Sequence, residues 1–319
     1  MSAIRTYLMM NKILALSPYA INKYKDWLKL YNKLGPSQGI FLADFPRKWI
    51  NKFNLEHSTI ATDDWDDWDE KRINEYLAHL KSINGFISLN SSYQENLPWE
   101  PNYLNLPKDK QSECIAIGSR ENKFNVPDFD KFDITLLNVS DTVSMKFSAS
   151  ELSSLLKTYF TNTEKIVFVD RHNYLLNPTG GFTEFTKLIR QIMELTKTKP
   201  LGEIVIFSLY NPREYSYMST TEELNKTLEK CFMGFRTPVY GIKYLCCSEA
   251  GTGDDLHARY ILTKNVAFQL TDSIPGNKSS QSITRLRDIA ETERLLKKWV
   301  DEEHKLVINT EATYINYTI

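Results

Sequence analysis

The sequence predicts an α/β protein with two domains. The chain has 319 residues, and a domain typically holds roughly 100–200 residues. Short apolar runs of strand length alternate with segments whose apolar residues recur at helical spacing. Ser148 precedes Glu151 by three positions, which is the signature of a helix start. This start places the domain boundary near residue 146, giving domains at 1–145 and 146–319.

The composition is that of an ordinary globular protein, with 42% hydrophobic and 25% charged residues. The formal net charge is -1, which does not imply a whole-molecule electrostatic attraction to nucleic acid but allows a local basic patch. No segment approaches the ~20 apolar residues of a membrane span, and the N-terminus lacks a continuous signal-peptide core. We therefore expect a cytoplasmic protein with no membrane association. None of the four cysteines has metal-ligand spacing, so free thiols are expected.

The N-terminal domain is expected to be α/β but of unrecognised type. Residues 39–53 begin as a buried strand, which Pro46 ends. The acidic run 63–70 is interpreted as a solvated loop feeding a helix over residues 73–83, since acidic residues suit a helix N-terminus. A cation site or a partner-binding patch is the alternative for this run. Further strands are expected at 85–89, 114–118 and 133–139.

The C-terminal domain shows a more regular alternation of elements. After a helix at 148–160, buried strands alternate with amphipathic helices, and the last two strands follow one another directly. This order predicts a βαβαβ unit with a mixed, largely parallel sheet, finished by a hairpin-like pair. Strands are expected at 165–170, 203–209, 239–247, 254–263 and 266–273, with helices at 182–195 and 221–232.

The segment Leu-His-Ala-Arg-Tyr-Ile-Leu-Thr carries the clearest chemical signal. On a strand, His257 and Arg259 share one face, because side chains alternate. Histidine can act as a nucleophile or an acid toward phosphorus, and the guanidinium fork of arginine matches two phosphate oxygens. By spacing alone, a structural pairing with Asp254 or Asp255 is the competing interpretation.

In this context the segment resembles one unit of the phospholipase D superfamily. In that family a β-α-β-α-β frame leads to a strand reading Leu-His-x-Lys and then to a second strand that ends in a small polar turn. Leu256, His257 and Arg259 match the first strand, with Arg in place of Lys, and Thr271 to Ser273 occupy the polar turn. Lys264 stands where the family has an acidic residue. The segment Val-Asp-Arg-His-Asn-Tyr-Leu-Leu-Asn-Pro is similar to the Asp-Pro-Tyr opening of the phospholipase D-like domains in MIT-domain proteins and in bacterial defence-associated proteins. The resemblance covers about residues 150–290.

A second cluster, Asp170, Arg171 and His172, follows the buried strand at 165–170. Open α/β sheets bind ligands at the carboxyl ends of their strands. We interpret Arg171 as a phosphate clamp, with Asp170 and Ser273 beside the phosphate, and His172 as an acid or base. The alternative is an exposed turn in which Asp170 caps the following backbone.

The resemblance implies a metal-independent phosphodiesterase or nuclease without cofactors, acting on nucleic acid in prokaryotic defence or a mobile-element system. Catalysis in the family uses one histidine to attack phosphorus and a second to protonate the leaving group. This chain shows one such motif, so a homodimer or His172 would have to supply the second histidine. The alternative function is a catalytically dead module that binds a protein partner or nucleic acid.

The basic stretch over residues 278–298 has two interpretations. Its lysines and arginines could follow a phosphate backbone. The more common arrangement is a solvated helix surface, with apolar residues such as Ile283 and Ile289 turned inward. The basic residues are Lys278, Arg285, Arg287, Arg294, Lys297 and Lys298.

Overall fold

The computed structural model divides the chain into two compact units, Met1–Ser140 and Asp141–Ile319. The boundary therefore lies before residue 141 and not near residue 146, because the strand Thr142–Met145 pairs with the C-terminal sheet. The structure describes residues 10–21, 23–59, 67–120, 122–196, 202–234, 241–249, 256–274 and 281–315, with only the backbone described for 55–59 and 67.

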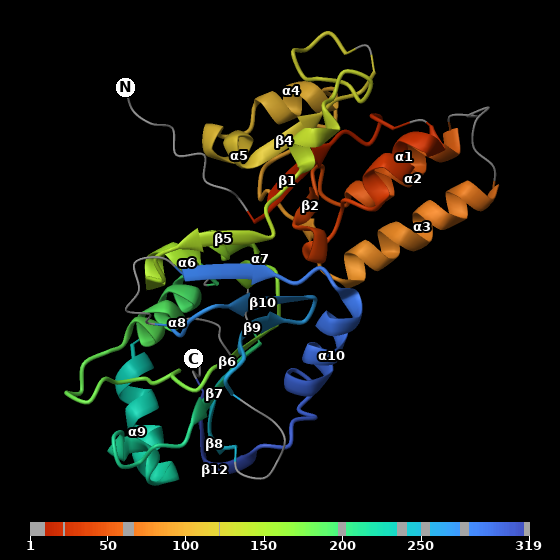
Figure 1. The fold of residues 1–319 in the computed structure, drawn as a ribbon. Coiled ribbons are helices and arrows are strands. Elements are labelled where there is room, and N and C mark those ends of the chain that lie inside the picture. The colour runs from red at the N-terminus through yellow and green to blue at the C-terminus, as the bar shows by residue number, and fades with distance from the viewer. Residues whose placement is uncertain are drawn as a thin grey trace. The chain divides into compact units, whose positions relative to one another are not determined.

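A four-stranded parallel sheet in the order β3-β2-β1-β4 forms the centre of the N-terminal unit. Its strands alternate along the chain with helices, which confirms the α/β class of this unit (Figure 1). The strands are β1 (Lys12–Leu16), β2 (Ile40–Ala43), β3 (Phe86–Ile87) and β4 (Cys114–Ile117). The helices are α1 (Tyr24–Tyr31), α2 (Trp49–Thr59), α3 (Asp67–Ser82), α4 (Trp99–Leu104) and α5 (Lys108–Glu113), with a 3₁₀ turn at Pro36–Gln38.

Helices cover both faces of this sheet. Leu14 of β1 belongs to a buried cluster with Trp27 of α1 and Leu77 of α3. Its neighbour Ala15 belongs to a second cluster with Trp99 of α4. Successive side chains of a strand point to opposite faces, so the two clusters mark two separate layers of helices. The unit is therefore a doubly wound parallel sheet.

The prediction of a strand at 133–139 is wrong. The structure has a 3₁₀ turn at Ile134–Leu137. The Asp133 carboxylate accepts hydrogen bonds from the Thr135 backbone N–H at 2.9 Å and from the Thr135 hydroxyl at 2.7 Å. Such local bonds to a short acidic side chain offer the backbone an alternative to a sheet ladder.

The C-terminal unit contains a mixed sheet in the order β12-β8-β7-β6-β9-β10-β11-β5. The expected parallel core is β6, β7 and β8. The sheet is not largely parallel, because the other ladders between its described strands are antiparallel. The strands are β5 (Thr142–Met145), β6 (Lys165–Val169), β7 (Glu203–Leu209), β8 (Gly241–Ser248), β9 (Arg259–Thr263), β10 (Val266–Leu270), β11 (Gln281–Arg285) and β12 (Val307–Tyr314).

Helices cover both faces of the parallel core (Figure 1). Phe168 of β6 packs edge-on against Phe185 of α8, while Phe207 of β7 packs against Trp299 of α10 on the other face.

The predicted helix start is confirmed, since Ser148 accepts from the Glu151 backbone N–H and donates to its carboxylate. No helix in the described ranges of either unit is long and apolar enough to cross a membrane. The helices are α6 (Ala149–Leu155), α7 (Lys157–Thr161), α8 (Glu184–Leu195), α9 (Thr221–Phe232) and α10 (Ile289–Trp299), with a 3₁₀ turn at Ser216–Met218.

Arg285 is fully buried, contrary to the solvated helix surface expected from the sequence. It ends β11, whereas the helix begins only at Ile289, whose side chain is itself exposed. The Arg285 guanidinium donates to Asp141 at 2.6 Å and to the Tyr159 hydroxyl at 3.1 Å. This arginine therefore joins β11 to the start of the unit and to α7. Lys278 lies outside the described residues.

We expect Asp141→Ala to lower the free energy of unfolding by about 3 kcal/mol, the lower end of the range for a buried ion pair that loses one partner. The Arg285 side chain is 0% exposed, so its charge would lose its carboxylate inside the protein. Urea denaturation measures the change. Arg287 also pairs with Asp141 but is largely exposed, so Arg287→Ala should cost under about 1 kcal/mol. Equal losses in the two variants would contradict the assigned role of Arg285.

Candidate functional site at the carboxyl edge of the C-terminal sheet

Four chain segments converge at one edge of the C-terminal sheet. The parallel strands β6 and β8 end there, followed directly by Asp170 and Glu249. Strand β9 runs antiparallel to β6, so it begins at the same edge with Arg259. Strand β10 returns there, with Leu270 opposite Arg259, and Ser273 follows. The chain topology therefore gathers side chains that are far apart in the sequence.

Asp170, Ser273 and Arg259 form a connected chain of hydrogen bonds. Arg259 Nε donates to Ser273 Oγ at 3.0 Å, and Ser273 Oγ donates to Asp170 Oδ1 at 3.0 Å. Arg259 Nε also lies 3.7 Å from the same carboxylate oxygen. Asp170 and Ser273 are buried, whereas 25% of the Arg259 side chain is exposed. The buried pair thus fixes a guanidinium whose outer part reaches solvent.

Burial raises the pKa of the Asp170 carboxyl above its ordinary value. The backbone N–H of His172, the Ser273 hydroxyl and the Arg259 charge act in the opposite direction, but burial is the largest effect. Moving a carboxylate out of water disfavours its charged form. This environment suits a positioning role, in which Asp170 holds Arg259 and Ser273. It does not suit direct contact with a phosphate.

Arg171 connects the second half of the site. Its Nη1 lies 2.7 Å from Nε2 and 3.3 Å from Nδ1 of His257, and its Nη2 lies 3.4 Å from Glu249 Oε2. A guanidinium can only donate, so the imidazole nitrogen that meets it must accept and carry no proton. Arg171 Nε is buried without a hydrogen-bond partner among the described residues. His257 is exposed at this edge.

The backbone beside Arg171 is held firmly by neighbouring strands. The Arg171 carbonyl accepts from the Leu209 backbone N–H at 3.1 Å. The Asn173 side chain donates to the Phe207 carbonyl at 3.0 Å, and the Asn173 carbonyl accepts from the buried Tyr244 hydroxyl at 2.8 Å. These bonds fix the direction in which Arg171 leaves the sheet.

His172 lies beside a pair of aromatic rings. It is exposed, its backbone N–H donates to Asp170 at 3.1 Å, and its ring lies edge-on to Tyr174 with centroids 5.7 Å apart. Tyr174 stacks on Tyr215 with centroids 3.9 Å apart. Asp170 thus caps the following backbone, as the alternative interpretation expected, and it also lies within ion-pair distance of Arg259. Neither tyrosine is among the site residues predicted from the sequence.

Two details differ from the expected strand over residues 254–263. The strand begins only at Arg259, so His257 lies on the segment that leads into it. Asp254 and Asp255, the alternative partners, lie outside the described residues. Lys264 occupies the exposed turn between β9 and β10, at the far end of the strand from Arg259. At about 3.3 Å per residue it lies roughly 15 Å away, so its charge does not enter the site.

Glu249 is the charged residue that the sequence prediction missed. Besides the ion pair with Arg171, it accepts from the Leu256 backbone N–H at 2.8 Å, one residue before His257. It therefore fixes both partners of the arginine–histidine contact. The signal was available, because Glu249 follows a buried parallel strand just as Asp170 does. Among the described residues, no group of three or more His, Cys, Asp or Glu side chains is placed to hold a metal ion.

Comparisons with known proteins give no assignment for this site. No protein-family model matches the chain, and no curated protein does. A similar solved structure is that of TrmBL2, described as an archaeal chromatin protein with a novel mode of DNA binding. It shares 11% identity, with 82% of this chain and 70% of that chain covered, at a TM-score of 0.28. A likeness this weak supports no argument about this chain.

We expect the stability advantage of the wild type over Asp170→Asn to shrink as the pH rises from about 4 to about 7. The folded-state pKa of Asp170 is raised, so the carboxyl stabilises the fold below its ordinary pKa of 3.8 and loses that contribution as it ionises inside the protein. Asparagine keeps an acceptor oxygen for Ser273 but does not titrate. Urea denaturation of both chains across this range tests the sign. An advantage that grows with pH would mean that the Arg259 charge outweighs burial.

Proposed function

We propose that the C-terminal unit is a phospholipase D-like phosphodiesterase that acts on nucleic acid, with His257 as its nucleophile. The observation that carries this proposal is the convergence of His257, Arg259, Arg171 and Ser273 at one edge of the sheet. These residue types can bind and attack a phosphate diester. The resemblance of the segment that carries His257 and Arg259 to the superfamily adds to this support.

Arg171 and Arg259 are suited to hold the phosphate. About a quarter of each side chain is exposed. Glu249 pairs with Arg171 and Asp170 pairs with Arg259, so each guanidinium is held by an acidic residue. A guanidinium binds two phosphate oxygens in its own plane, and a fixed guanidinium loses little freedom on binding. The two arginines would thus hold the diester next to the imidazole of His257.

The reaction follows from the contact between Arg171 and His257. A bound phosphate draws the Arg171 N–H toward its own oxygens, which leaves the lone pair of His257 Nε2 available. Nε2 then forms a bond to phosphorus while the bond from phosphorus to the leaving oxygen breaks, and that oxygen takes a proton from a general acid. Water next attacks the phosphorus and gives a proton to the same group, which is now a base, while the bond from phosphorus to Nε2 breaks. This step releases the phosphate product and restores the imidazole. His172 or the His257 of a second copy would be the acid.

The neighbouring aromatic rings favour nucleic acid over a lipid headgroup as the substrate. Tyr174 and Tyr215 are stacked beside His172, and Tyr215 is only partly buried. Bases of a single strand stack on such rings without sequence preference. A phosphate group held by arginines next to stacked aromatic rings matches one nucleotide unit of a strand.

A second candidate function is a non-catalytic module that binds nucleic acid or a protein partner. The observation that favours it is the 2.7 Å contact between Arg171 and His257, because it occupies the nitrogen that a nucleophile needs. The lysine at position 264 also favours it, because the family has an acidic residue there.

A single-stranded oligonucleotide assayed with EDTA present distinguishes the two functions. We expect cleavage that His257→Ala abolishes while binding persists. Arg259→Ala should weaken binding by roughly 1.5–3 kcal/mol, the range for hydrogen bonds to charged groups. Arg294→Ala removes an exposed arginine from α10 and should change neither quantity.

Binding without cleavage in the wild type would favour the non-catalytic module. A chain that neither binds nor cleaves the oligonucleotide would overturn the phosphodiesterase and the nucleic-acid-binding module, and would leave a module that binds a protein partner. Cleavage that EDTA abolishes and Mg²⁺ restores would contradict the histidine mechanism, because its nucleophile is an imidazole and not a metal-bound water.

If the chain is active, we expect a two-fold homodimer that brings two His257 side chains to one cleft, because two-fold dimers are the commonest oligomers. Mixed with a constant amount of wild type, increasing His257→Ala chain should then lower activity below that of the wild type alone, because mixed dimers lack one histidine. Light scattering supplies the assembly state. Full activity in a monomer would contradict the dimer and make His172→Ala the decisive variant.

A further inference from the structure

The loop that follows β7 lies at the same edge of the sheet as the proposed phosphodiesterase site. Strand β7 runs parallel between β6 and β8, so its carboxyl end meets theirs at that edge. The Leu209 backbone N–H donates to the Arg171 carbonyl at 3.1 Å. The next N–H, that of Tyr210, donates to the Cys247 carbonyl at 2.8 Å. The loop therefore starts beside an arginine that would hold the phosphate.

The far end of this loop is anchored as well. The Tyr217 hydroxyl accepts from the Leu175 backbone N–H at 3.0 Å. The Met218 carbonyl accepts from the Thr310 hydroxyl at 2.9 Å, and the Met218 backbone N–H donates to the Tyr215 carbonyl at 3.0 Å. Tyr215 is thus presented by a loop that is fixed at both ends.

One face of the Tyr215 ring is covered, and the rest of the ring is partly open. The covering ring is that of the buried Tyr174, with centroids 3.9 Å apart, while Tyr217 lies edge-on at 6.1 Å. Burial raises the pKa of Tyr174, and the charges of Arg171 and Asp170 also act on its hydroxyl, so the ring pair lies close to the proposed phosphate site. A base of a bound strand can stack on the surface of Tyr215 that Tyr174 leaves uncovered.

An exposed carboxylate, that of Glu214, stands beside this ring. It accepts from the Asn211 side-chain amide at 2.9 Å. Burial and then the Glu214 carboxylate raise the pKa of Tyr215 to about 12, so the phenol keeps its proton and can donate to that carboxylate. A carboxylate offers about four acceptor positions, so two donors orient it and leave other positions open to solvent. The loop thus places a charged acceptor next to a stacking surface.

Guanine is the base whose donors match this acceptor best. Its N1–H and N2–H lie side by side on one edge, so they can donate to the two oxygens of one carboxylate. Cytosine and adenine each offer one amino group beside an acceptor nitrogen. Thymine offers a single N–H between two carbonyl oxygens, which a carboxylate repels. A carboxylate also repels phosphate, so Glu214 is suited to meet a base and not the backbone of the strand.

We propose that the loop after β7 forms a base subsite that prefers guanine in a single strand, with Tyr215 as its stacking platform and Glu214 as its specificity-determining residue. The base stacks on Tyr215 while its N1–H and N2–H donate to Glu214, and the adjacent phosphate reaches Arg171 and Arg259. The subsite rests on the proposed function and adds a base preference to it, because stacking by itself does not distinguish bases.

Short single-stranded thymine oligonucleotides that carry guanine, inosine or thymine at the centre test this proposal, with EDTA present. Inosine keeps the N1–H of guanine and lacks its 2-amino group. Fluorescence anisotropy measures binding, and gel mapping locates any cuts. We expect the guanine strand to bind about tenfold more tightly than the thymine strand, the lower end of the effect of a hydrogen bond to a charged group. Inosine should lie between them, and cuts should concentrate beside the guanine.

Glu214→Gln should bring the affinities for the guanine and thymine strands together, because an amide has one acceptor oxygen and its NH₂ group opposes a donor of the base. Glu222→Gln, which changes an exposed glutamate of α9, is the matched control and should keep the guanine preference. Tyr215→Leu should weaken both strands together, because every base can stack on an aromatic ring.

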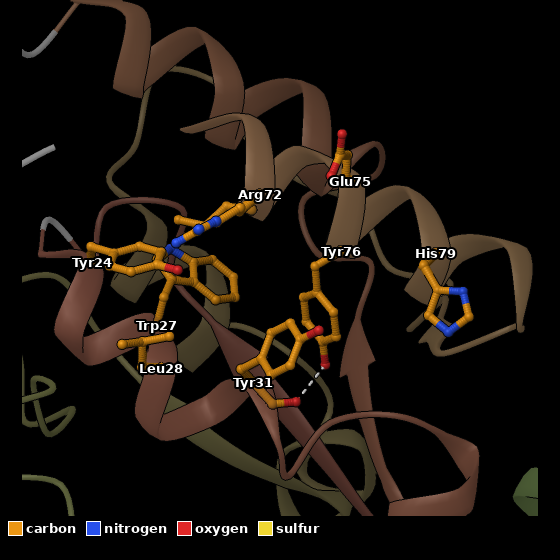
Figure 2. Close-up of a pocket in the computed structure, with 9 residues that line it drawn as sticks. Tyr24, Trp27, Leu28, Tyr31, Arg72, Glu75, Tyr76 and His79 are labelled. Atoms are coloured by element: carbon orange, nitrogen blue, oxygen red, sulfur yellow. Dashed lines mark hydrogen bonds between the residues drawn. The ribbon is translucent and has the colours of Figure 1, made fainter. Parts of the chain in front are cut away.

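A second pair of tyrosines, in the N-terminal unit, supplies the control for stacking. Tyr31 of α1 lies against Tyr76 of α3 with ring centroids 4.3 Å apart, and both line a cavity of about 470 Å³ (Figure 2). Tyr31→Leu removes a ring that is 48% exposed and keeps the backbone carbonyl that accepts from the Tyr76 hydroxyl at 2.9 Å. It should leave the affinity for both strands unchanged. A loss as large as that in Tyr215→Leu would overturn the base subsite, because the strand would then bind at the N-terminal cavity.

The remaining outcomes separate the base subsite from the proposed function. Equal affinity of the wild type for the guanine and thymine strands would overturn the subsite and leave the phosphodiesterase standing. A guanine preference that survives in Glu214→Gln, or inosine bound as tightly as guanine, would overturn the assigned contact with Glu214. A chain that neither binds nor cleaves any of the strands would overturn the proposed function, and the base subsite with it.

Discussion

The candidate site depends on one buried carboxylate, that of Asp170. It accepts from the Ser273 hydroxyl and the His172 backbone, and it lies within ion-pair distance of Arg259. These three contacts join the end of β6, the start of β9 and the segment after β10. A buried carboxylate is unfavourable unless it is paired or hydrogen-bonded. The three segments therefore have to meet in one arrangement, and that arrangement aims Arg259 outward.

The second constraint is the contact of Arg171 with His257. Glu249 fixes both partners, because it pairs with Arg171 and accepts a hydrogen bond from the Leu256 backbone N–H, next to His257. One acidic residue thus pairs with each arginine. The Arg171–Glu249 pair joins the segments after β6 and β8, and the Arg259–Asp170 pair joins the end of β6 to the start of β9. The charges at this edge are nearly balanced within the protein, in keeping with the small net charge of the chain. Attraction to an anion would come from the geometry of the exposed N–H groups more than from a broad positive field.

Local sequence patterns predicted strands β6 to β10 and the helices between them, but not β5, β11 or β12. Together with the family resemblance, they also predicted five of the residues that the structure connects there. Asp170 and Arg171 follow an apolar strand run, while His257, Arg259 and Ser273 lie around the next hairpin. Their contacts depend on strand order, which local patterns do not reveal. The same limitation explains Arg285, which is buried because β11 pairs with β5. It also explains the N-terminal unit, where helices and strands were expected but not the order β3-β2-β1-β4.

The positions of β5 and β12 have a consequence for shortened chains. They are the first and last strands of the C-terminal unit, and they are the outermost strands on the two sides of its sheet. Strand β12 covers β8 along a ladder from Ser248 to Ile242, and most of β8 is apolar and buried. A chain that ended before Val307 would leave the hydrogen-bonding groups of β8 open to another strand. Such exposed apolar edge strands promote aggregation. By pairing with β8, β12 therefore protects the unit from self-association.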